Sequence, residues 1–256
     1  MAIVRTKRQR RKARRFVIAR LVTAAVIGLV IVVAFQIYSF LTTSDKLAVT
    51  TVTFDGLSRV DSAEVDRLVA DIRGQNILLA PLEKYAARFQ GHPRLHGVQL
   101  KKILPNRVVC TVEERESVAL VYANGFHEVD DEGMIMTSDE LTDLLDLPII
   151  TGLDAESVEE GKYCRDIRLV ESLEILKLCK RYGGGFAGEI SELKIGKTGI
   201  NVVSLKEGMV LLLGESEYER RLKKFFLIRK TITDRDNTAR LVDLRFEDQV
   251  VLRSGI

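Results

Sequence analysis

Two histidines carry the most obvious metal-binding spacing in this chain of 256 residues. His92 and His96 are four positions apart, which would place two imidazoles on one face of a helix. Pro93 and Gly97 disfavour a continuous helix there, and no nearby Cys or carboxylate completes a ligand set. We therefore interpret the pair as loop residues and predict no metal site.

Other stretches resemble nucleotide, calcium or nucleophile sites without completing them. Residues 196–198 (GKT) look like the end of a phosphate-binding loop, but Ser191 stands where its first Gly is required and no helix pattern follows. The acidic run 130–132 (DDE) offers oxygen ligands for Ca²⁺, yet neighbouring acids in a tight hairpin point in different directions, so we expect a solvated turn. No Gly-x-Ser-x-Gly elbow occurs. We predict no catalytic residue, no cofactor and no small-molecule substrate, and hence a protein that is not an enzyme.

Three cysteines cannot form a disulfide scaffold. Cys110 alternates with Val108 and Val112, so we expect a small buried apolar side chain. Cys164 and Cys179 could form a bridge in an oxidising exterior, although the spacing of Cys179 also suits helix packing. The sequence leaves that bridge open.

The chain begins with a basic segment that is followed by an apolar one. Residues 1–20 hold nine Lys and Arg and no acid, and residues 21–44 hold no charge. About 20 apolar residues cross the roughly 30 Å hydrocarbon layer. A cleaved signal peptide is the competing interpretation, but its apolar core is shorter and 47–49 (LAV) offers no small-x-small cleavage site. We expect an uncleaved transmembrane anchor over 21–44.

The basic residues predict the orientation of that anchor. Lys and Arg beside the first span stay cytoplasmic, so we expect a single-pass protein of the cytoplasmic (inner) membrane, with 1–20 as its cytoplasmic tail and 45–256 exported to the other side. The dense basic run 10–15 also fits nucleic-acid or anionic-lipid binding. Retention of the tail in the cytoplasm during membrane insertion explains the same charges with fewer assumptions, so we expect no nucleic-acid partner. The residues expected to set the topology are Arg10, Arg11, Lys12, Arg14, Arg15 and Arg20.

Residues 45–115 have the pattern of a small β-α-α-β-β domain. A β-branched strand over 49–54 precedes Asp61, a typical helix N-cap, and an amphipathic helix that Gly74 stops. Pro81 suits the first turn of a second helix, and two alternating strands follow, joined by 104–106 (LPN).

Residues 116–256 change to short strands with hairpin turns, giving an α+β chain overall. Three short strands lie between 118 and 136, and a helix is expected over about 167–182. A meander between 190 and 213, a last amphipathic helix and two closing strands over 239–246 and 249–253 complete a mixed antiparallel β domain with flanking helices.

Short motifs in a fixed order across nearly the whole chain resemble the FtsQ/DivIB family of bacterial cell-division proteins. The matching stretches are 52–57 (VTFDGL), Pro105 with 108–115 (VVCTVEER), 129–135 (VDDEGMI), 147–152 (LPIITG), and 213–214 (LG) with 221–225 (RLKKF) and 242–246 (VDLRF). Ser117 stands where the family commonly has Pro, which leaves the bend into the second domain less defined.

The resemblance implies a non-enzymatic divisome scaffold that links early and late division proteins at the septum. It implies a POTRA-like domain over 45–115 and a β domain over 116–256 that binds small coiled-coil bitopic partners of the FtsB/FtsL type. A POTRA-bearing assembly or translocation component is the alternative, disfavoured because it normally carries repeated modules or a membrane barrel. A membrane-anchored hydrolase is a third possibility, disfavoured by the missing catalytic residues.

The closing strands are the predicted partner-binding site. If they lie at a sheet edge, their free backbone groups can accept a partner strand. Arg245 could pair with a partner carboxylate and Phe246 could add apolar contact, whereas the alternative places Leu244 and Phe246 in the core and Arg245 in an internal salt bridge. The predicted residues are Asp243, Leu244, Arg245, Phe246, Val250 and Val251.

Overall fold

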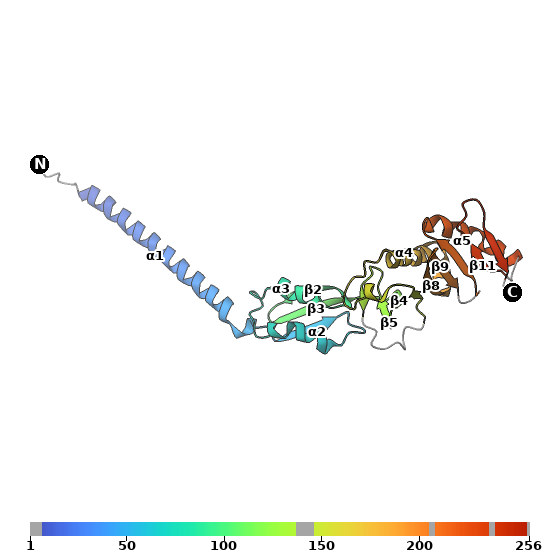
Figure 1. Cartoon of the computed structure of the whole chain (residues 1–256). Helices are drawn as coiled ribbons and strands as arrows, with labels where there is room; N and C mark the ends of the chain where they lie inside the picture. Colours follow the sequence, from blue (N-terminus) through green and yellow to red (C-terminus); the bar gives the residue numbers. More distant parts are fainter. Residues whose placement is uncertain (1–6, 137–145, 205–207, 236–238, 255–256) are drawn as a thin grey trace. The chain divides into compact units, whose positions relative to one another are not determined.

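The computed structural model describes residues 7–136, 146–204, 208–235 and 239–254, without the side chains of 7–15, 204, 233–235 and 239 (Figure 1). Helix α1 spans Lys7–Thr43 and leads into a 3₁₀ turn, η1, at Asp45–Leu47. Within the described part of the chain, Phe16–Thr43 is the one segment long and apolar enough to cross a membrane, judged by length and composition. All its side chains except that of the half-buried Thr42 are exposed, as a lipid-facing helix requires.

Contacts divide the chain into two compact units. The first comprises Met1–Ala87 with Val98–Val112, and the second Arg88–Gly97 with Glu113–Ile256. Strands β2 and β3 each continue from one unit into the other.

The first unit confirms the predicted β-α-α-β-β order. Its elements are β1 (Thr51–Asp55), α2 (Ser62–Val69), the 3₁₀ turn η2 (Ala70–Ile72), α3 (Leu82–Phe89), β2 (Leu95–Ile103) and β3 (Arg107–Glu114). The sheet order is β1-β3-β2, with β1 parallel to β3. Asp61 caps α2 as predicted, since its side chain accepts a hydrogen bond from the backbone N–H of Ala63. Val65 and Val69 of α2 are buried with Val108 and Cys110 of β3, because each element turns its apolar positions inward.

The second unit contains a mixed sheet and two long helices. Its strands run in the order β12-β11-β10-β9-β8-β7-β4-β5-β6. Three neighbouring pairs are parallel (β10 with β11, β4 with β7, β7 with β8), so the sheet is less uniformly antiparallel than the sequence indicated. The strands are β4 (Ala119–Tyr122), β5 (Phe126–Val129), β6 (Ile135–Met136), β7 (Ile149–Thr151), β8 (Ile190–Gly196), β9 (Gly199–Ser204), β10 (Val210–Gly214), β11 (Ala239–Asp243) and β12 (Val251–Ser254). The helices are α4 (Ile167–Tyr182) and α5 (Tyr218–Arg235), with 3₁₀ turns η4 (Ala155–Ser157) and η5 (Gly184–Glu189).

The core of this unit lies between the sheet and its helices. Leu193, Val202, Leu211 and Val242 lie opposite one another on β8, β9, β10 and β11, and all four are fully buried. Helices α4 and α5 pack against each other in the same unit (Figure 1). Buried residues of both, with Leu222 on α5 among them, belong to the same apolar cluster as the strand residues. One sheet face and two helix stripes therefore hold the unit together.

Candidate partner-binding site

Strand β12 lies at one end of the nine-stranded order, with β11 on its inner side. Leu252 of β12 pairs with Val242 of β11, which in turn pairs with Leu211 of β10. These three residues therefore lie on the same sheet face. Val242 and Leu211 are fully buried, whereas Leu252 is 38 % exposed. The apolar face thus continues to the edge and is left partly uncovered there.

The predicted site residues separate into buried and exposed groups. Leu244 is fully buried in the core and Asp243 is 4 % exposed. Val250 packs against the core and Val251 is half-buried. Phe246 is 43 % exposed, and the Arg245 side chain is 38 % exposed. Burial therefore leaves Arg245 and Phe246 as the more accessible members of the predicted set.

The prediction that a closing strand runs to Phe246 was wrong, because β11 ends at Asp243. The Oδ1 atom of Asp243 accepts a hydrogen bond of 3.1 Å from the backbone N–H of Arg245. This side-chain turn competes with the sheet ladder and takes the chain out of the strand. Residues 244–246 of the predicted strand therefore lie outside β11.

Asp243 and Arg245 also form a two-point ion pair. Nε of Arg245 donates to Oδ1 at 2.9 Å, and Nη2 donates to Oδ2 at 2.7 Å. The hydrogen bonds from Arg245 lower the pKa of Asp243 against the opposing effect of burial, and the pair raises the pKa of the guanidinium. The local contact is thus the internal pair that the sequence left as an alternative to a partner carboxylate.

Helix α5 fixes the connection between β11 and β12. The ammonium group of Lys224 donates to the carbonyl oxygens of Phe246, at 3.1 Å, and Glu247, at 2.6 Å. Arg220 pairs with the carboxylate of Glu247 at 3.4 Å. Because these contacts bind the backbone, the side chain of Phe246 is presented outward from a fixed loop.

The residues predicted to set topology lie at the start of α1. The side chains of Arg10, Arg11, Lys12, Arg14 and Arg15 are outside the described part of the structure. Arg20 is exposed, and its guanidinium carbon lies 4.4 Å from the centre of the Phe16 ring.

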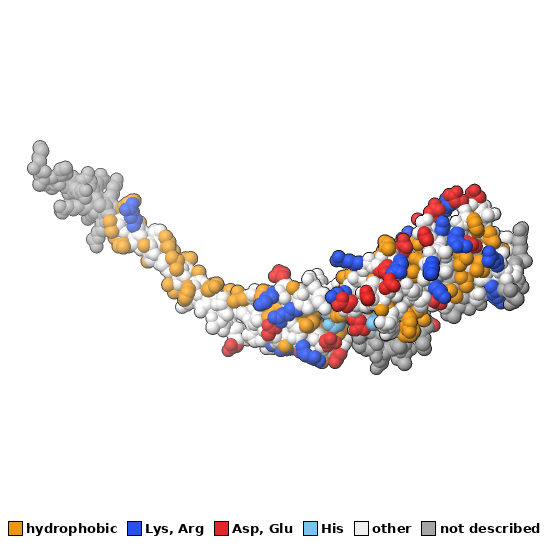
Figure 2. Space-filling view, in the orientation of Figure 1, with side chains coloured by type: hydrophobic (Ala, Val, Ile, Leu, Met, Phe, Trp, Pro, Cys, Tyr) orange, Lys and Arg blue, Asp and Glu red, His pale blue; other side chains and the backbone are white. Residues whose placement is uncertain are grey.

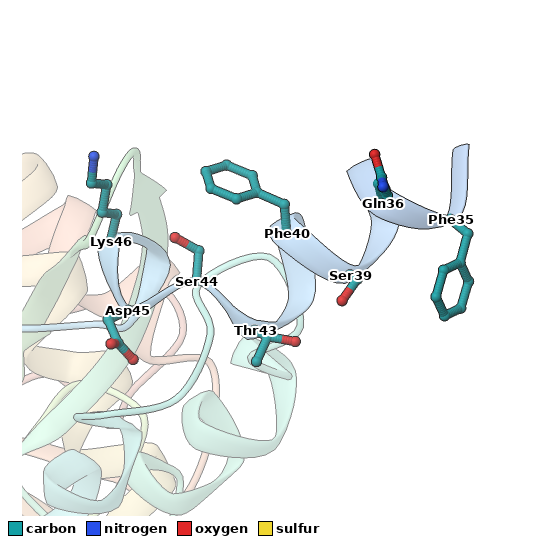
Figure 3. Close-up of a pocket in the computed structure, with 8 residues that line it drawn as sticks. All are labelled: Phe35, Gln36, Ser39, Phe40, Thr43, Ser44, Asp45 and Lys46. Carbon is teal, nitrogen blue, oxygen red and sulfur yellow. The ribbon is translucent and has the colours of Figure 1, made fainter. Parts of the chain in front are cut away.

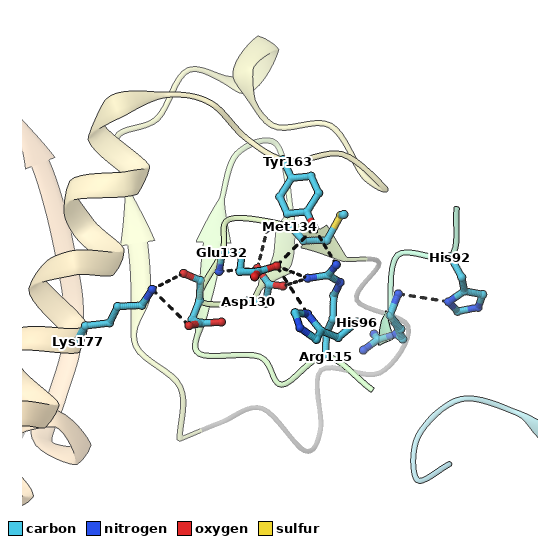
Figure 4. Close-up of polar contacts among 10 residues, drawn as sticks. His92, His96, Arg115, Asp130, Glu132, Met134, Tyr163 and Lys177 are labelled. Carbon is cyan, nitrogen blue, oxygen red and sulfur yellow. Dashed lines mark hydrogen bonds and ion pairs between the residues drawn. The ribbon is translucent and has the colours of Figure 1, made fainter. Parts of the chain in front are cut away.

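A second polar cluster joins two stretches that carried the family resemblance (Figure 4). Arg115 is the last residue of the stretch 108–115. Its guanidinium donates to the carboxylates of Asp130 and Glu132, which belong to the stretch 129–135. The Arg115 and Asp130 side chains are 7 % and 4 % exposed, so this is a buried ion pair. Burial tends to lower the pKa of Arg115, but the hydrogen bonds to the two carboxylates raise it above its ordinary value.

The turn at 130–132 is only partly the solvated turn that the sequence suggested, because Asp131 and Glu132 are exposed but Asp130 is buried. Oδ1 of Asp130 accepts backbone N–H bonds from Glu132, at 2.9 Å, and Met134, at 2.8 Å. The carboxylate is oriented by the hairpin backbone and neutralised by Arg115, which explains its burial. The sequence missed this pair because nothing local links Arg115 with a carboxylate in the next hairpin.

A neighbouring pair connects the same hairpin to the start of β2. Arg94 donates to Glu128 through both terminal nitrogens, at 2.8 and 3.2 Å. The hydroxyl of Ser117 also donates to Glu128. Ser117 departs from the family's usual Pro, and here its side chain helps to satisfy a buried carboxylate.

Metal and thiol chemistry receive no support in the described residues. They contain no group of three or more His, Cys, Asp or Glu able to hold a metal ion. His92 follows the end of α3 and His96 lies in β2, so the two do not share a helix. Cys164 and Cys179 are both free and buried, and burial raises the pKa of Cys179 to about 12.

Comparison with known proteins gives both units a family. Residues 47–115 match the model described as POTRA domain, FtsQ-type, and residues 119–245 match the model described as Cell division protein FtsQ/DivIB, C-terminal. The POTRA match covers the β-α-α-β-β domain, and the second match covers the mixed sheet as far as Arg245.

Three relatives, each named Cell division protein FtsQ, extend the similarity to most of the chain. The Myxococcus fulvus protein is 28% identical over 202 residues, covering 79% of this chain and 71% of the relative. The Geobacter sp. (strain M21) protein is 25% identical over 220 residues, covering 85% and 80%. The Anaeromyxobacter sp. (strain K) protein is 28% identical over 213 residues, covering 82% and 72%. The chain belongs to the FtsQ/DivIB family of cell division proteins.

Proposed function

We propose that this protein is a single-pass divisome scaffold whose exported β domain holds small bitopic partners of the FtsB/FtsL type at the division septum. The family match supports a role in cell division, and the apolar α1 supports membrane anchoring. The basic residues before the apolar segment support a cytoplasmic N-terminus, because Lys and Arg beside a first span stay on the cytoplasmic side.

The position of β12 at the sheet end is the observation that carries the partner-binding proposal. The outer edge of a terminal strand presents backbone N–H and C=O groups that an added strand can pair with. All but the first residue of β12 are exposed. An extended segment of a partner can thus lengthen the sheet by one strand.

Apolar side chains beside that edge are expected to make the surface specific for its partner. Leu252 continues the core face of the sheet to the edge, and Phe246 projects from the fixed connection. A partner that places apolar side chains over these two residues removes their exposed surface from water, at about 25 cal/mol for each Å². Nε and one N–H of Nη2 of Arg245 already bond Asp243, so Nη1 and the second N–H of Nη2 can donate to a partner carboxylate.

Capture of partners by the full-length chain tests the proposal. Membranes carrying the tagged chain are solubilised, and co-purified small bitopic proteins are identified and quantified. We expect Phe246→Ser and Leu252→Ser each to lower capture by about tenfold, the loss of one well-packed apolar contact. Leu227→Ser is the matched control, since Leu227 on α5 is 83 % exposed and lies outside the proposed surface.

Equal capture by all three variants and the unchanged chain would rule out this surface. Loss of capture by Leu227→Ser alone would also reject it and move the interface to α5. Both edge residues are exposed, so their replacement leaves the core intact.

A further inference from the structure

The loop that follows η2 is bonded to the end of helix α1. The side-chain amide of Asn76 donates to the carbonyl oxygens of Leu41, at 2.6 Å, and Thr42, at 3.1 Å. Its own oxygen accepts from the backbone N–H of Leu78 at 2.9 Å. Ile77 donates to the carbonyl of Leu47 at 2.7 Å. These contacts satisfy carbonyls that a helix end leaves open, and they fix the loop beside the point where α1 ends.

Exposed apolar side chains follow directly in this loop. Leu78 is 42 % exposed and Leu79 is 63 % exposed. A trans peptide chain advances at most about 3.6 Å per residue, so Leu79 lies within roughly 11 Å of the backbone of Asn76. The two leucines therefore lie close to the end of α1, and they are exposed instead of being packed into the first unit.

The turn between β2 and β3 brings two more apolar residues to the same end. Ile103 is 38 % exposed and Leu104 is 62 % exposed. The carbonyl of Asn106 in this turn accepts a 2.9 Å hydrogen bond from Thr50, which lies between η1 and β1. The ammonium group of Lys102 donates to the carbonyl of Leu78 at 3.0 Å. The loop and the turn therefore form one surface, defined by Leu78, Leu79, Ile103 and Leu104, which we call the leucine rim.

Basic side chains lie next to the leucine rim. Lys101, Lys102 and Arg107 are exposed, and the stretch 101–107 contains no acid. On the helix side, Lys46 lines a hollow with Phe35 and Phe40, and Figure 3 shows Phe40 and Lys46 on the same side of the chain. Hydrophobic side chains line α1 over the part whose side chains are described, from residue 16 onward (Figure 2). Apolar residues flanked by Lys and Arg at the end of a span are what a lipid headgroup boundary accommodates.

We propose that the leucine rim inserts into the lipid headgroup boundary of the bilayer that α1 spans, with the flanking lysines against lipid phosphates. This inference rests on the proposed membrane span. The bilayer is the occupant because Asn76, two residues before Leu78 in the same loop, is hydrogen-bonded to the last turn of the apolar helix, and the lipid surface must lie near that depth. Contact with lipid restrains the first unit at the membrane instead of leaving it on a free tether.

Depth-dependent fluorescence quenching of the full-length chain in liposomes tests the insertion. Single cysteines are introduced by Leu79→Cys and Leu104→Cys and labelled with a small fluorophore; the native cysteines are buried, and the unchanged chain gives the background. Thr111→Cys is the matched control, because Thr111 is exposed on β3 and pairs with Asp55 at the far end of β1 from the turn. Lipids carry a nitroxide just below the headgroup.

We expect nitroxide quenching to be at least about threefold stronger at positions 79 and 104 than at position 111. Aqueous iodide should quench the labels at 79 and 104 at least about threefold less than the label at 111. Equal nitroxide quenching at all three positions overturns the inference. Protection from iodide without nitroxide quenching also overturns it, because a protein and not lipid would then cover the rim.

A label within the span separates failure of this inference from failure of the proposed anchoring. Leu29→Cys lies in the apolar part of α1 and should be quenched by a nitroxide deep in the acyl chains. Deep quenching at 29 with none at 79 or 104 rejects the leucine rim alone. Absence of quenching at 29 rejects the span, and the inference with it.

Discussion

Replacing Arg115 by Met should open the hairpin that contains Asp130 without unfolding the first unit. Arg115 and Asp130 are 7 % and 4 % exposed, and the methionine keeps the apolar stem while removing the cation. The carboxylate then remains buried and uncompensated, a change that costs about 3–5 kcal/mol. At about 1.4 kcal/mol for each factor of ten, the open state becomes roughly a hundred to a few thousand times more populated.

Alkylation of Cys164 in the folded chain measures this opening. The backbone N–H of Cys164 donates to the carbonyl of Gly133 at 2.9 Å, and its thiol is buried against the hairpin. Its labelling rate should rise by the same factor in Arg115→Met, while buried Cys110 in the first unit stays unchanged and serves as the internal control. Labelling follows the open population when closing is faster than alkylation.

Asp130→Asn is the matched partner variant. Asparagine keeps an acceptor for the N–H groups of Glu132 and Met134, and Arg115 keeps its contact of 3.0 Å with Glu132. We expect a smaller rise in the labelling of Cys164 than for Arg115→Met. An unchanged Cys164 rate in Arg115→Met, or an equal rise at Cys110, would refute the view that the ion pair locks this hairpin.

Three further expectations follow from backbone strain, thiol burial and a shifted carboxyl pKa. Gly199→Ala should lower the free energy of unfolding by about 1–3 kcal/mol in a urea titration, because φ is +103° and a Cβ would lie 1.9 Å from the backbone of Gly214. Gly188→Ala is the control and should leave that free energy unchanged, because a Cβ there meets open space. Burial raises the pKa of Cys110 and Cys179 to about 12, so both should react with a thiol reagent at about pH 8 more than roughly 1,000-fold slower than a free thiol; fast reaction would contradict their burial. The pKa of Asp243 is lowered, so its contribution to stability is present above the usual Asp range near pH 3.9 and is lost as the pH falls through the lowered value. The hydrogen-exchange protection of β12, corrected for the intrinsic exchange rate at each pH, should fall in that acid range and stay constant near neutral pH.

Periodicity and caps predicted the helices well because both are local. Apolar side chains at spacings of three and four residues mark α4, whose predicted bounds of about 167–182 match Ile167–Tyr182. The N-cap of α2 at Asp61 was likewise readable from residue type. Such signals depend only on residues within one or two helical turns along the sequence, so they can be recognised without knowing the fold.

Sheet order and ion pairing were not predictable in the same way. Strand β7 has three residues, too few to show an alternation, yet it joins β4 to β8 through parallel pairs. Arg115 meets Asp130 only after the hairpin closes. In the candidate site, the sequence predicted the edge position of the closing strands only as a condition. It missed the end of β11, because the turn made by the Asp243 side chain depends on a hydrogen bond to the backbone of Arg245.

The contact between Asp243 and Arg245 recurs elsewhere in the second unit, which bears on the role of Arg245. Asp166 accepts from the backbone N–H of Arg168 at 2.9 Å and pairs with its guanidinium at 3.0 and 2.7 Å, at the N-cap of α4. The same Asp-x-Arg geometry thus terminates a strand at one place and starts a helix at the other. Its common effect is to fix a change of chain direction, so we expect Arg245 to act mainly by holding the connection that presents Phe246.

Hydrogen exchange and partner capture together separate these two roles. Arg245→Ala should speed exchange across 244–250 and lower capture, because the connection loses its two-point pair. Phe246→Ala should lower capture with exchange unchanged, since its side chain is exposed and its carbonyl keeps the bond from Lys224. If Arg245→Ala lowers capture while exchange stays the same, the guanidinium contacts the partner directly, and the Asp-x-Arg pair does more than terminate a strand.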